Sequence, residues 1–315
     1  MDKFMLPPKF FDEEPREIRI SPRVKRIWGV ELDLLFKFAE VCKRHNIPWF
    51  IDGGSLLGAA RHGGFIPWDD DIDVCMFRND FEKLERIAST EFMHPYFWQT
   101  FKTDLQSARG HATLRNSLTT AIARRNLVNG RTNRIFNQGI FLDIFPLDNI
   151  PDATEEAERF LLGVRERISK VRFLVNYPIE LKSRKWRVFS SKSGIVDFFK
   201  YIRYCISARV RGKNALQLAA EEHENWCKRY NGITTMRACT IAHWPIRKNR
   251  QYYRREWFDK TIILNFEMLK VPAPIGYKEL LGGLYGNWEE HVISETLHGG
   301  LFFDTEHSYK DYLLK

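Results

Sequence analysis

The sequence contains no apolar run long enough to cross a bilayer, so it predicts no transmembrane helix. Its first residues also lack the apolar stretch of a secretory signal, and its five cysteines are dispersed and odd in number. This pattern is typical of a protein whose cysteines stay reduced rather than of a secreted disulfide scaffold, so we expect a cytoplasmic location. There is no Walker A loop, no G-x-S-x-G elbow and no C-x-x-C pair, and we find no internal repeat or low-complexity linker.

The composition is that of an ordinary globular protein. The chain has 315 residues, of which 44% are hydrophobic and 28% are charged. Its net charge of +9 is concentrated in residues 182–213, which hold ten basic residues and one acidic residue. The remainder of the chain is therefore balanced in charge.

The densest chemistry lies in a run of four aspartates: Asp69, Asp70, Asp71 and Asp73. Apolar residues alternate with Asp71 and Asp73, which predicts a β-strand that presents both carboxylates on one face. Two carboxylates roughly 6–7 Å apart along a strand repel each other unless a cation lies between them. Hard divalent ions such as Mg²⁺ take oxygen ligands of this kind, commonly together with substrate phosphates.

The residues just before this strand predict an anion site. A short apolar strand precedes the turn Gly53-Gly54-Ser55, and residues of helical spacing follow until the glycines at 63 and 64. Free backbone N–H groups at the start of such a helix favour a bound anion. Arg61 and His62, at the far end of the helix, are kept near the aspartates by a short loop.

A further carboxylate interrupts an apolar strand predicted at residues 139–148. A buried Asp143 is costly unless it is paired, protonated or bound to a metal. It is either hydrogen-bonded to a nearby loop or the third carboxylate ligand beside Asp71 and Asp73. We interpret Asp148, which follows in the same stretch, as a turn residue or loop cap.

The string GGSLLGAARHGGFIPWDDDID resembles the signature of the LicD family, a group that includes the fukutin-related proteins within the nucleotidyltransferase superfamily. Residues 139–148 are similar to the second signature block of the family, which carries the third carboxylate of the superfamily. Tyr285-Gly-Asn-Trp288 and His298 resemble its closing block. The resemblance implies an α/β (α+β) fold with a nucleotidyltransferase-type mixed sheet core, flanking helices and a largely helical C-terminal half. We accordingly expect an extended N-terminal arm, a catalytic core and a mainly helical region that completes the substrate cleft, at residues 1–20, 21–150 and 151–315.

The resemblance also implies a reaction. A LicD protein transfers a phospho-alcohol group, phosphocholine by default, from a CDP-linked donor to a sugar hydroxyl and releases CMP. The acceptor is a cell-surface glycan, such as lipopolysaccharide, capsule or teichoic acid, or its lipid-linked precursor. Carried over to this chain, the metal ligands and catalytic residues are Asp71, Asp73 and Asp143, and they would hold two Mg²⁺ or Mn²⁺ ions. The expected substrate-binding and phosphate-binding residues are Gly53, Gly54, Ser55, Arg61, His62, Asp70, Arg115 and His298.

Three other functions remain open. A nucleotidyltransferase proper would use the same carboxylates to move NMP from an NTP to a small molecule or RNA, and it would release pyrophosphate. A polymerase-like enzyme would use the basic segment to hold nucleic acid, but we consider that partner unlikely because no recognised binding motif accompanies the charge. A metal-dependent scaffold without activity is disfavoured, since it has no need of all three carboxylates.

Residues 195–211 have the pattern of a basic amphipathic helix. Such a helix binds a membrane surface, which would place the protein peripherally on the inner membrane face, or it packs on a core with its charges in water. Two metal motifs are disfavoured. An EF-hand would need glycine where Val74 stands and glutamate where Asp80 stands. A zinc site is unlikely because its ligands would follow the unusual order His223, Cys227, Cys239 and His243.

Overall fold

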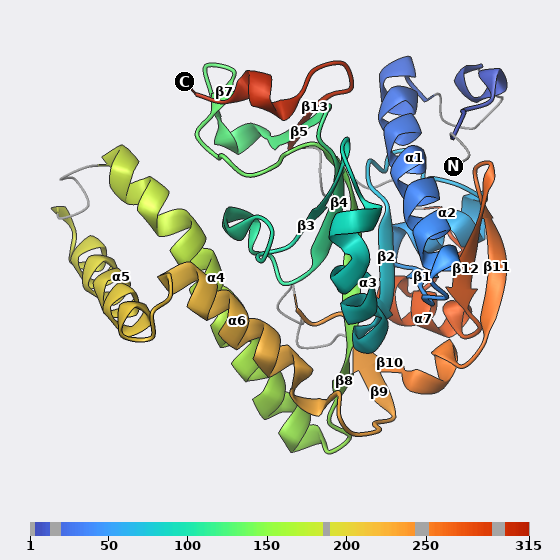
Figure 1. Cartoon of the computed structure of the whole chain (residues 1–315). Coiled ribbons are helices and arrows are strands. Elements are labelled where there is room, and N and C mark those ends of the chain that lie inside the picture. The colour runs from blue at the N-terminus through green and yellow to red at the C-terminus, as the bar shows by residue number, and fades with distance from the viewer. Residues whose placement is uncertain (1–3, 13–19, 185–189, 243–251, 292–299, 315) are drawn as a thin grey trace.

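The computed structural model describes residues 4–12, 20–184, 190–242, 252–291 and 300–314. Figure 1 shows a twisted mixed sheet with helices against it, and the helices labelled α4, α5 and α6 extend to one side. The α-helices are α1 (Pro22–Arg44), α2 (Gly53–His62), α3 (Arg78–Glu91), α4 (Thr154–Arg184), α5 (Lys192–Val210), α6 (Ala215–Cys227) and α7 (Tyr277–Tyr285). The strands of the main sheet are β1 (Phe50–Ile51), β2 (Asp73–Phe77), β3 (Tyr96–Gln99), β4 (Ala112–Asn116), β8 (Ile140–Ile150), β9 (Arg237–Cys239) and β10 (Tyr253–Arg254). Smaller pairs are formed by β5 (Thr120–Ala123) with β13 (Leu301–Asp304), β6 (Leu127–Val128) with β7 (Arg131–Thr132), and β11 (Thr261–Phe266) with β12 (Leu269–Pro274).

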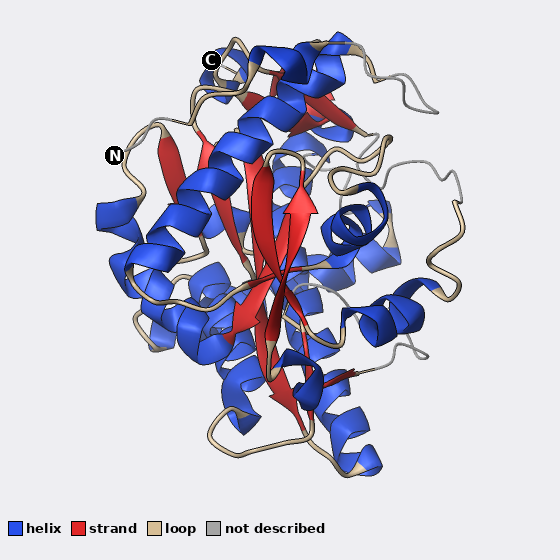
Figure 2. Ribbon diagram, turned by 90° about the vertical axis from the view of Figure 1, so that its right-hand side faces the viewer, coloured by secondary structure: helices blue, strands red, loops and turns tan. Residues whose placement is uncertain are grey.

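Strand β8 is the centre of the main sheet. The strand order is β1-β2-β8-β4-β3, in which β2 and β8 run parallel and the other neighbours are antiparallel. All eleven residues of β8 are buried, as expected for a strand covered on both faces. Figure 2, turned by 90°, shows helices on either side of these strands. The mixed sheet with flanking helices confirms the predicted fold class.

Helix α1 follows from its sequence signals. Ser21 caps it by accepting a hydrogen bond from the N–H of Val24 at 3.3 Å, and Pro22 occupies the first turn, where its missing N–H costs nothing. The helix ends at Arg44, with Lys43 and Arg44 in its last turn. Its apolar stripe packs into the main core, which also contains the inner residues of β2 and β8.

Two segments differ from the sequence-based expectation. Within the arm, Pro8–Phe11 form a 3₁₀ turn and Phe10 is buried, so this part is docked on the body rather than extended. Asp148 is neither a turn residue nor a loop cap, because it lies in β8. Its two carboxylate oxygens accept hydrogen bonds from Nε and Nη2 of Arg78 at 2.8 and 2.6 Å, and this buried ion pair joins α3 to the sheet.

The long helices α4, α5 and α6 form a separate layer. Buried residues of α4 and α6 make a second apolar cluster, to which Ala108 adds. In Figure 1 α5 is the outermost of the three helices, on the side away from the sheet. After α6 the chain returns, and β9 pairs with β8, so the C-terminal half contributes strands to the main sheet as well as helices. Among the described residues, no helix combines the length and the apolar character needed to span a membrane.

Candidate active site

The parallel pairing of β2 with β8 places two of the predicted carboxylates side by side. Asp73, the first residue of β2, lies opposite Asp143 of β8, and Thr113 of β4 lies opposite Asp143 on its other side. The hydroxyl of Thr113 donates a hydrogen bond to Oδ1 of Asp143 at 2.9 Å. The sequence predicted both carboxylates, and the strand register now brings them to adjacent positions.

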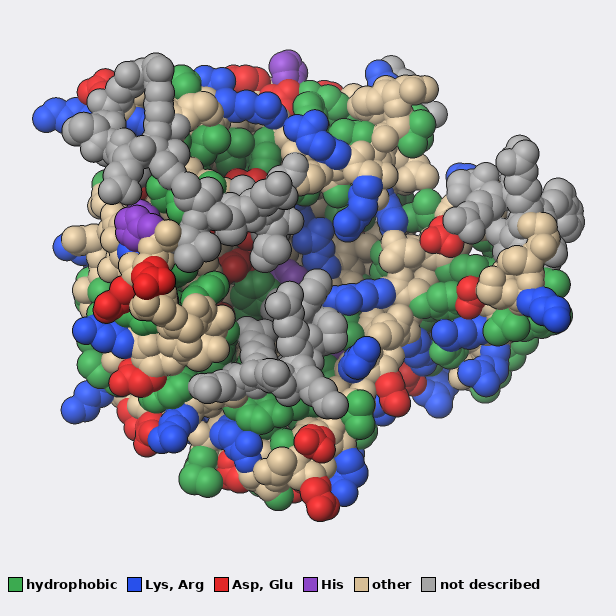
Figure 3. Space-filling view, turned by 180° about the vertical axis from the view of Figure 1, so that it is seen from behind, with side chains coloured by type: hydrophobic (Ala, Val, Ile, Leu, Met, Phe, Trp, Pro, Cys, Tyr) green, Lys and Arg blue, Asp and Glu red, His purple; other side chains and the backbone are tan. Residues whose placement is uncertain are grey.

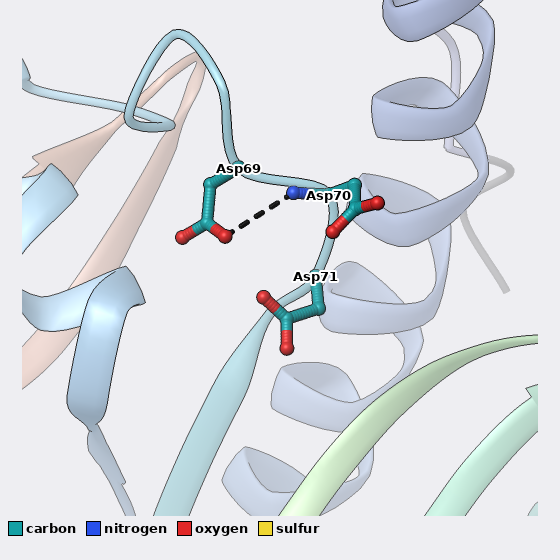
Figure 4. Close-up of side chains that lie close together, drawn as sticks. All are labelled: Asp69, Asp70 and Asp71. Carbon is teal, nitrogen blue, oxygen red and sulfur yellow. Dashed lines mark hydrogen bonds between the residues drawn. The ribbon is translucent and has the colours of Figure 1, made fainter. Parts of the chain in front are cut away.

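The loop before β2 brings in the neighbouring aspartates. Asp69, Asp70 and Asp71 each offer a carboxylate oxygen, and these three oxygens lie within 4.8 Å of one another (Figure 4). The indole N–H of Trp28 on α1 donates to the backbone carbonyl of Asp69 at 2.9 Å. This contact fixes the loop against α1, and Asp69 joins the group although the predicted site did not include it.

The glycines that open α2 allow carboxylates to approach the helix start. Gly53 has φ +56°, and a Cβ atom there would lie 3.0 Å from Oδ2 of Asp73. A Cβ atom on Gly54 would lie 2.8 Å from Oδ2 of Asp69. Both carboxylates therefore lie against the positive end of the helix dipole, which stabilises negative charge. The predicted anion site is thus shared with the protein's own carboxylates.

The side chain of Ser55 is engaged in the same region. Its hydroxyl accepts a hydrogen bond from the N–H of Asp73 at 2.9 Å and donates to the carbonyl of Asp71 at 3.5 Å. Ser55 is buried, and it holds the backbone that carries both aspartates. Its predicted contact with a phosphate stays a prediction.

The clustered carboxylates repel one another, and a nearby positive charge would relieve this repulsion. Burial, followed by the charges of Asp71 and Asp143, raises the pKa of Asp73 well above its usual value. Asp143 differs. Burial alone would raise its pKa, but the interactions with His111 and the charge of Arg109 outweigh this effect and hold its pKa below the ordinary range. Clustered oxygen donors of this kind fit a hard divalent cation.

The sequence-based prediction missed His111 and Arg109. Nε2 of His111 lies 3.5 Å from Oδ1 of Asp143, and its ring packs on Phe145 with centroids 4.7 Å apart. Arg109 is half-buried nearby, and its charge acts on Asp143. The available signal was the polar, partly basic stretch that leads into β4, but only the strand pairing shows that it runs beside Asp143.

Glu31 on α1 is a second residue that the sequence-based prediction missed. It is 1% exposed, and its Oε2 has no hydrogen-bond partner among the described residues. Burial, followed by the charges of Asp71 and Asp70, raises its pKa well above the ordinary value. The sequence signal was an acidic residue on the apolar stripe of α1, where a charge is costly.

The remaining predicted substrate-binding residues make different contacts. Arg61 donates from Nη1 to the carbonyls of Trp288 and Glu290, at 3.1 and 2.7 Å, and so ties α2 to the segment after α7. The ring of His62 lies 5.1 Å from that of His291, centroid to centroid. Asp70 belongs to the aspartate loop. His298 lies outside the described residues.

Arg115 is an internal residue rather than an exposed phosphate ligand. It is 1% exposed, its Nε donates to Oε1 of Gln99 at 2.5 Å, and its Nη1 donates to the carbonyl of Gly139 at 2.6 Å. Burial lowers its pKa to about 9. These contacts give it a structural position on β4.

Two residues of the disfavoured zinc motif contact each other, since Sγ of Cys227 lies 3.8 Å from Nε2 of His223. His223 and Cys227 lie on α6, and Nε2 of His223 is 2.6 Å from the carbonyl of Ala242. Cys239 is buried in β9, and His243 lies outside the described residues. In the part of the chain that the structure describes, the grouping with metal-ligand spacing is that of the three consecutive aspartates.

Figure 3 shows the face seen from behind, which is hollowed near its centre. Acidic, histidine and basic side chains are visible around the hollow, with basic side chains gathered on one side of it. Opposite charges around one depression suit a ligand that carries phosphates together with metal ions.

Comparison with known proteins places the site within a recognised segment. Residues 46–156 match the family model described as "LicD/FKTN/FKRP, nucleotidyltransferase domain". This match includes the start of α2, the aspartate loop, β2, β4 and β8, and therefore all of the carboxylates above except that of Glu31.

Curated relatives extend the comparison. The chain is 27% identical, over 263 residues, to "Lipopolysaccharide cholinephosphotransferase LicD" of Haemophilus influenzae, covering 82% of this chain and 88% of that protein. It is 41% identical over 51 residues to the human "Ribitol 5-phosphate transferase FKRP", which is 16% of this chain and 10% of that protein. A 47% identical match over 47 residues to an uncharacterised protein of Caenorhabditis elegans covers 15% of this chain and 12% of that protein.

Proposed function

Because the chain belongs to the LicD family of phospho-alcohol transferases, we propose that it moves phosphocholine, or a related phospho-alcohol, from a CDP-linked donor to a sugar hydroxyl. CMP would be the leaving group. The acceptor would be a cell-surface glycan or its lipid-linked precursor. A relative named as a lipopolysaccharide cholinephosphotransferase, similar over most of both chains, supports choline as the first alcohol to test. The short match to a ribitol 5-phosphate transferase makes ribitol the second.

One observation carries the proposal. Asp73 and Asp143 face each other across the parallel strands β2 and β8, and the start of α2 lies against Asp73. The charges of Asp71 and Asp143 both act on Asp73, which supports a common site for the three carboxylates. Neighbouring carboxylates, of which Asp71 and Asp143 are buried and Asp73 is half-buried, are the arrangement expected for metal-assisted transfer at phosphorus.

The oxygen donors fit Mg²⁺ or Mn²⁺, and two ions would be held by Asp71, Asp73 and Asp143. When bound, these ions would neutralise the donor phosphates and make the acceptor hydroxyl more acidic. In Asp143, Oδ1 accepts a hydrogen bond from Thr113 and lies 3.5 Å from Nε2 of His111. Oδ2 would then be the oxygen that serves this role.

The reaction balances as a displacement at the phosphorus atom that carries the alcohol. The acceptor oxygen forms a new P–O bond, the bond from that phosphorus to the bridging oxygen breaks, and CMP leaves with the bridging oxygen. The hydroxyl proton passes to Asp71 or Asp143. Arg109, whose charge reaches Asp143, would bind the donor phosphates and hold them in line for attack.

The test is donor turnover by the purified protein. We would incubate it with Mg²⁺ and, separately, CDP-choline, CDP-ribitol, CDP-ethanolamine and each NTP, and identify products by mass spectrometry. We expect CMP from a CDP-alcohol, by slow hydrolysis in the absence of acceptor. Asp73→Asn should abolish it, whereas Asp259→Asn, the same change at an exposed position, should not.

The other outcomes assign the function differently. Pyrophosphate from an NTP, lost in Asp73→Asn, would make the protein a nucleotidyltransferase proper, which the same carboxylates and the description of the matched family model also support. Equal CMP release by the parent protein and Asp73→Asn would refute a role for this site. If no donor turns over, a thermal-shift assay with the same nucleotides tests whether the protein binds them. A lack of Mg²⁺-dependent binding to any CDP-alcohol would contradict the proposal.

A further inference from the structure

Helix α5 exposes an apolar face. Ile195, Phe199, Ile202 and Ile206 recur at spacings of three and four residues and are all exposed, with Phe199 at 66%. Val210 continues the stripe and is 83% exposed. Scattered apolar residues on a surface are normal, but a contiguous stripe along one helix marks an interaction site.

The opposite side of α5 accounts for its attachment to the protein. Ala208 is the one buried residue recorded for the helix, and Tyr201 and Tyr204 pack half-buried against the cluster formed by α4 and α6. The helix is therefore attached to the protein through the side that carries Ala208, Tyr201 and Tyr204. Its isoleucines and Phe199 face outward. Figure 1 places the helix at the edge of the molecule.

Cations border the apolar stripe. Lys192, Arg203 and Arg209 are exposed, and no described acidic residue forms an ion pair with them. In contrast, Arg211 pairs with Glu222 at 3.1 Å, and Lys213 pairs with Glu221.

Two further charged residues of α5, Lys200 and Asp197, do not belong to its outward surface. Lys200 leans inward over the ring of Phe173, 4.7 Å from its centroid. Asp197, the one acid on the helix, is half-buried. The outward surface of α5 is thus apolar and positively charged.

We propose that α5 docks on a lipid bilayer with anionic headgroups, lying in the plane of the surface with its apolar stripe among the acyl chains. Helices that combine an apolar stripe with flanking Lys and Arg bind in this way. At 19 residues the helix is about 28 Å long, enough for several lipids to contact it at once. The inference goes beyond the proposed reaction and does not depend on it.

Charge argues for a membrane and against a second copy of the chain. A twofold dimer through this face would place the same patch opposite itself, so the free cations of one copy would meet those of the other. Like charges that are brought together in this way oppose association. An anionic lipid surface supplies the complementary sign and an apolar interior in one partner.

The experiment is flotation of the full chain with vesicles. One set contains phosphatidylcholine alone, and the other contains phosphatidylcholine mixed with phosphatidylglycerol. We expect binding to the mixed vesicles only, weakened by added salt. Each cation near an anionic surface contributes about five-fold in partitioning, so the double variant Arg203→Glu, Arg209→Glu should lose at least about 25-fold. The double variant Phe199→Ser, Ile206→Ser should lose at least about ten-fold.

Matched controls separate this site from general effects. Lys43→Glu with Arg86→Glu makes the same change of charge at exposed positions of α1 and α3. Ile233→Ser with Ile263→Ser removes equally exposed apolar groups elsewhere. Both control proteins should bind vesicles as the parent does.

Three results would overturn the inference. The first is equal binding by the parent and both α5 variants. The second is equal binding to neutral and anionic vesicles. The third is a stable dimer in sedimentation without lipid that Phe199→Ser, Ile206→Ser converts to monomer, since that would assign the face to a second copy. Because none of these measurements requires turnover, failure of the proposed reaction leaves this test intact.

Discussion

At the residue scale, Asp73 combines a functional position with an unfavourable setting. It is placed beside Asp71 and Asp143, with the start of α2 against one of its oxygens. Burial and these like charges raise its pKa, so its ionised form is less stable here than in water. A site that favours a cation therefore weakens the protein when no cation is bound.

This argument gives a prediction for Asp73→Asn. In the presence of a chelator the variant should melt about 2–4 °C above the parent, because the change removes repulsion worth roughly 1 kcal/mol. With Mg²⁺ the parent should gain stability by binding, and the variant should gain much less. Differential scanning fluorimetry in EDTA and in Mg²⁺ measures both effects, with Asp259→Asn as control. A variant that melts lower in EDTA, or that responds to Mg²⁺ as the parent does, would contradict it.

Single residues also show where sequence reasoning stops. Asp71, Asp73 and Asp143 could be predicted because carboxylates amid apolar strand residues need a cation or a partner. The structural role of Arg115 could not be predicted, because its partners Gln99 and Gly139 are distant in sequence. Only the pairing of β4 brings them together. The position of His111 beside Asp143 depends on the same pairing.

At the element scale, the C-terminal end is fastened by one carboxylate. Asp304, at the end of β13, accepts hydrogen bonds from the hydroxyl of Tyr312 at 2.6 Å and from the backbone N–H groups of Glu306 and His307 at 2.8 and 3.1 Å. Burial alone would raise its pKa, but these bonds outweigh it and lower the pKa to about 2, from 3.8 for an unperturbed group. The pairing of β13 with β5 therefore has a pH-sensitive support.

The sign of the effect follows from linkage. Because the folded pKa lies below the unfolded value, the contribution of Asp304 is fully present above about pH 4 and is lost as the pH falls toward 2. The parent should thus lose more stability between pH 5 and pH 3 than Asp304→Asn does. Urea unfolding at the two pH values measures this difference, and Asp311→Asn serves as the exposed control. Equal losses in the parent and Asp304→Asn would show that the carboxylate contributes nothing.

Elements differ in how well their sequences determined them. Helix α1 was predictable within two residues because Ser21 and Pro22 mark its start and its apolar stripe is long. The participation of β9 and β10 in the main sheet was not predictable from the sequence. Each is a short strand whose pairing depends on contacts far along the chain. The docked 3₁₀ turn at Pro8–Phe11 was missed because prolines and charges in the arm concealed a single buried anchor, Phe10.

At the scale of the whole molecule, charge and apolar surface are divided between two regions. The sheet carries the acidic site, whereas residues 182–213, which include α5, carry the excess of positive charge. The sequence predicted this separation of charge in residues 182–213. It left open whether the apolar stripe of residues 195–210 faces a core or solvent, because periodicity fixes the faces of a helix but not what lies against them.

The same division predicts unequal local stability. Every residue of β8 is buried, whereas α5 buries Ala208, so α5 should open without global unfolding and its amides should exchange orders of magnitude faster than those of β8. Hydrogen exchange followed by mass spectrometry measures both elements in one sample. Adding vesicles that contain phosphatidylglycerol should slow exchange in α5 and leave β8 unchanged, whereas phosphatidylcholine vesicles should change neither. Exchange in α5 as slow as in β8 without lipid would mean that the helix is already held on the protein, and its exposed stripe would then need no partner for stability.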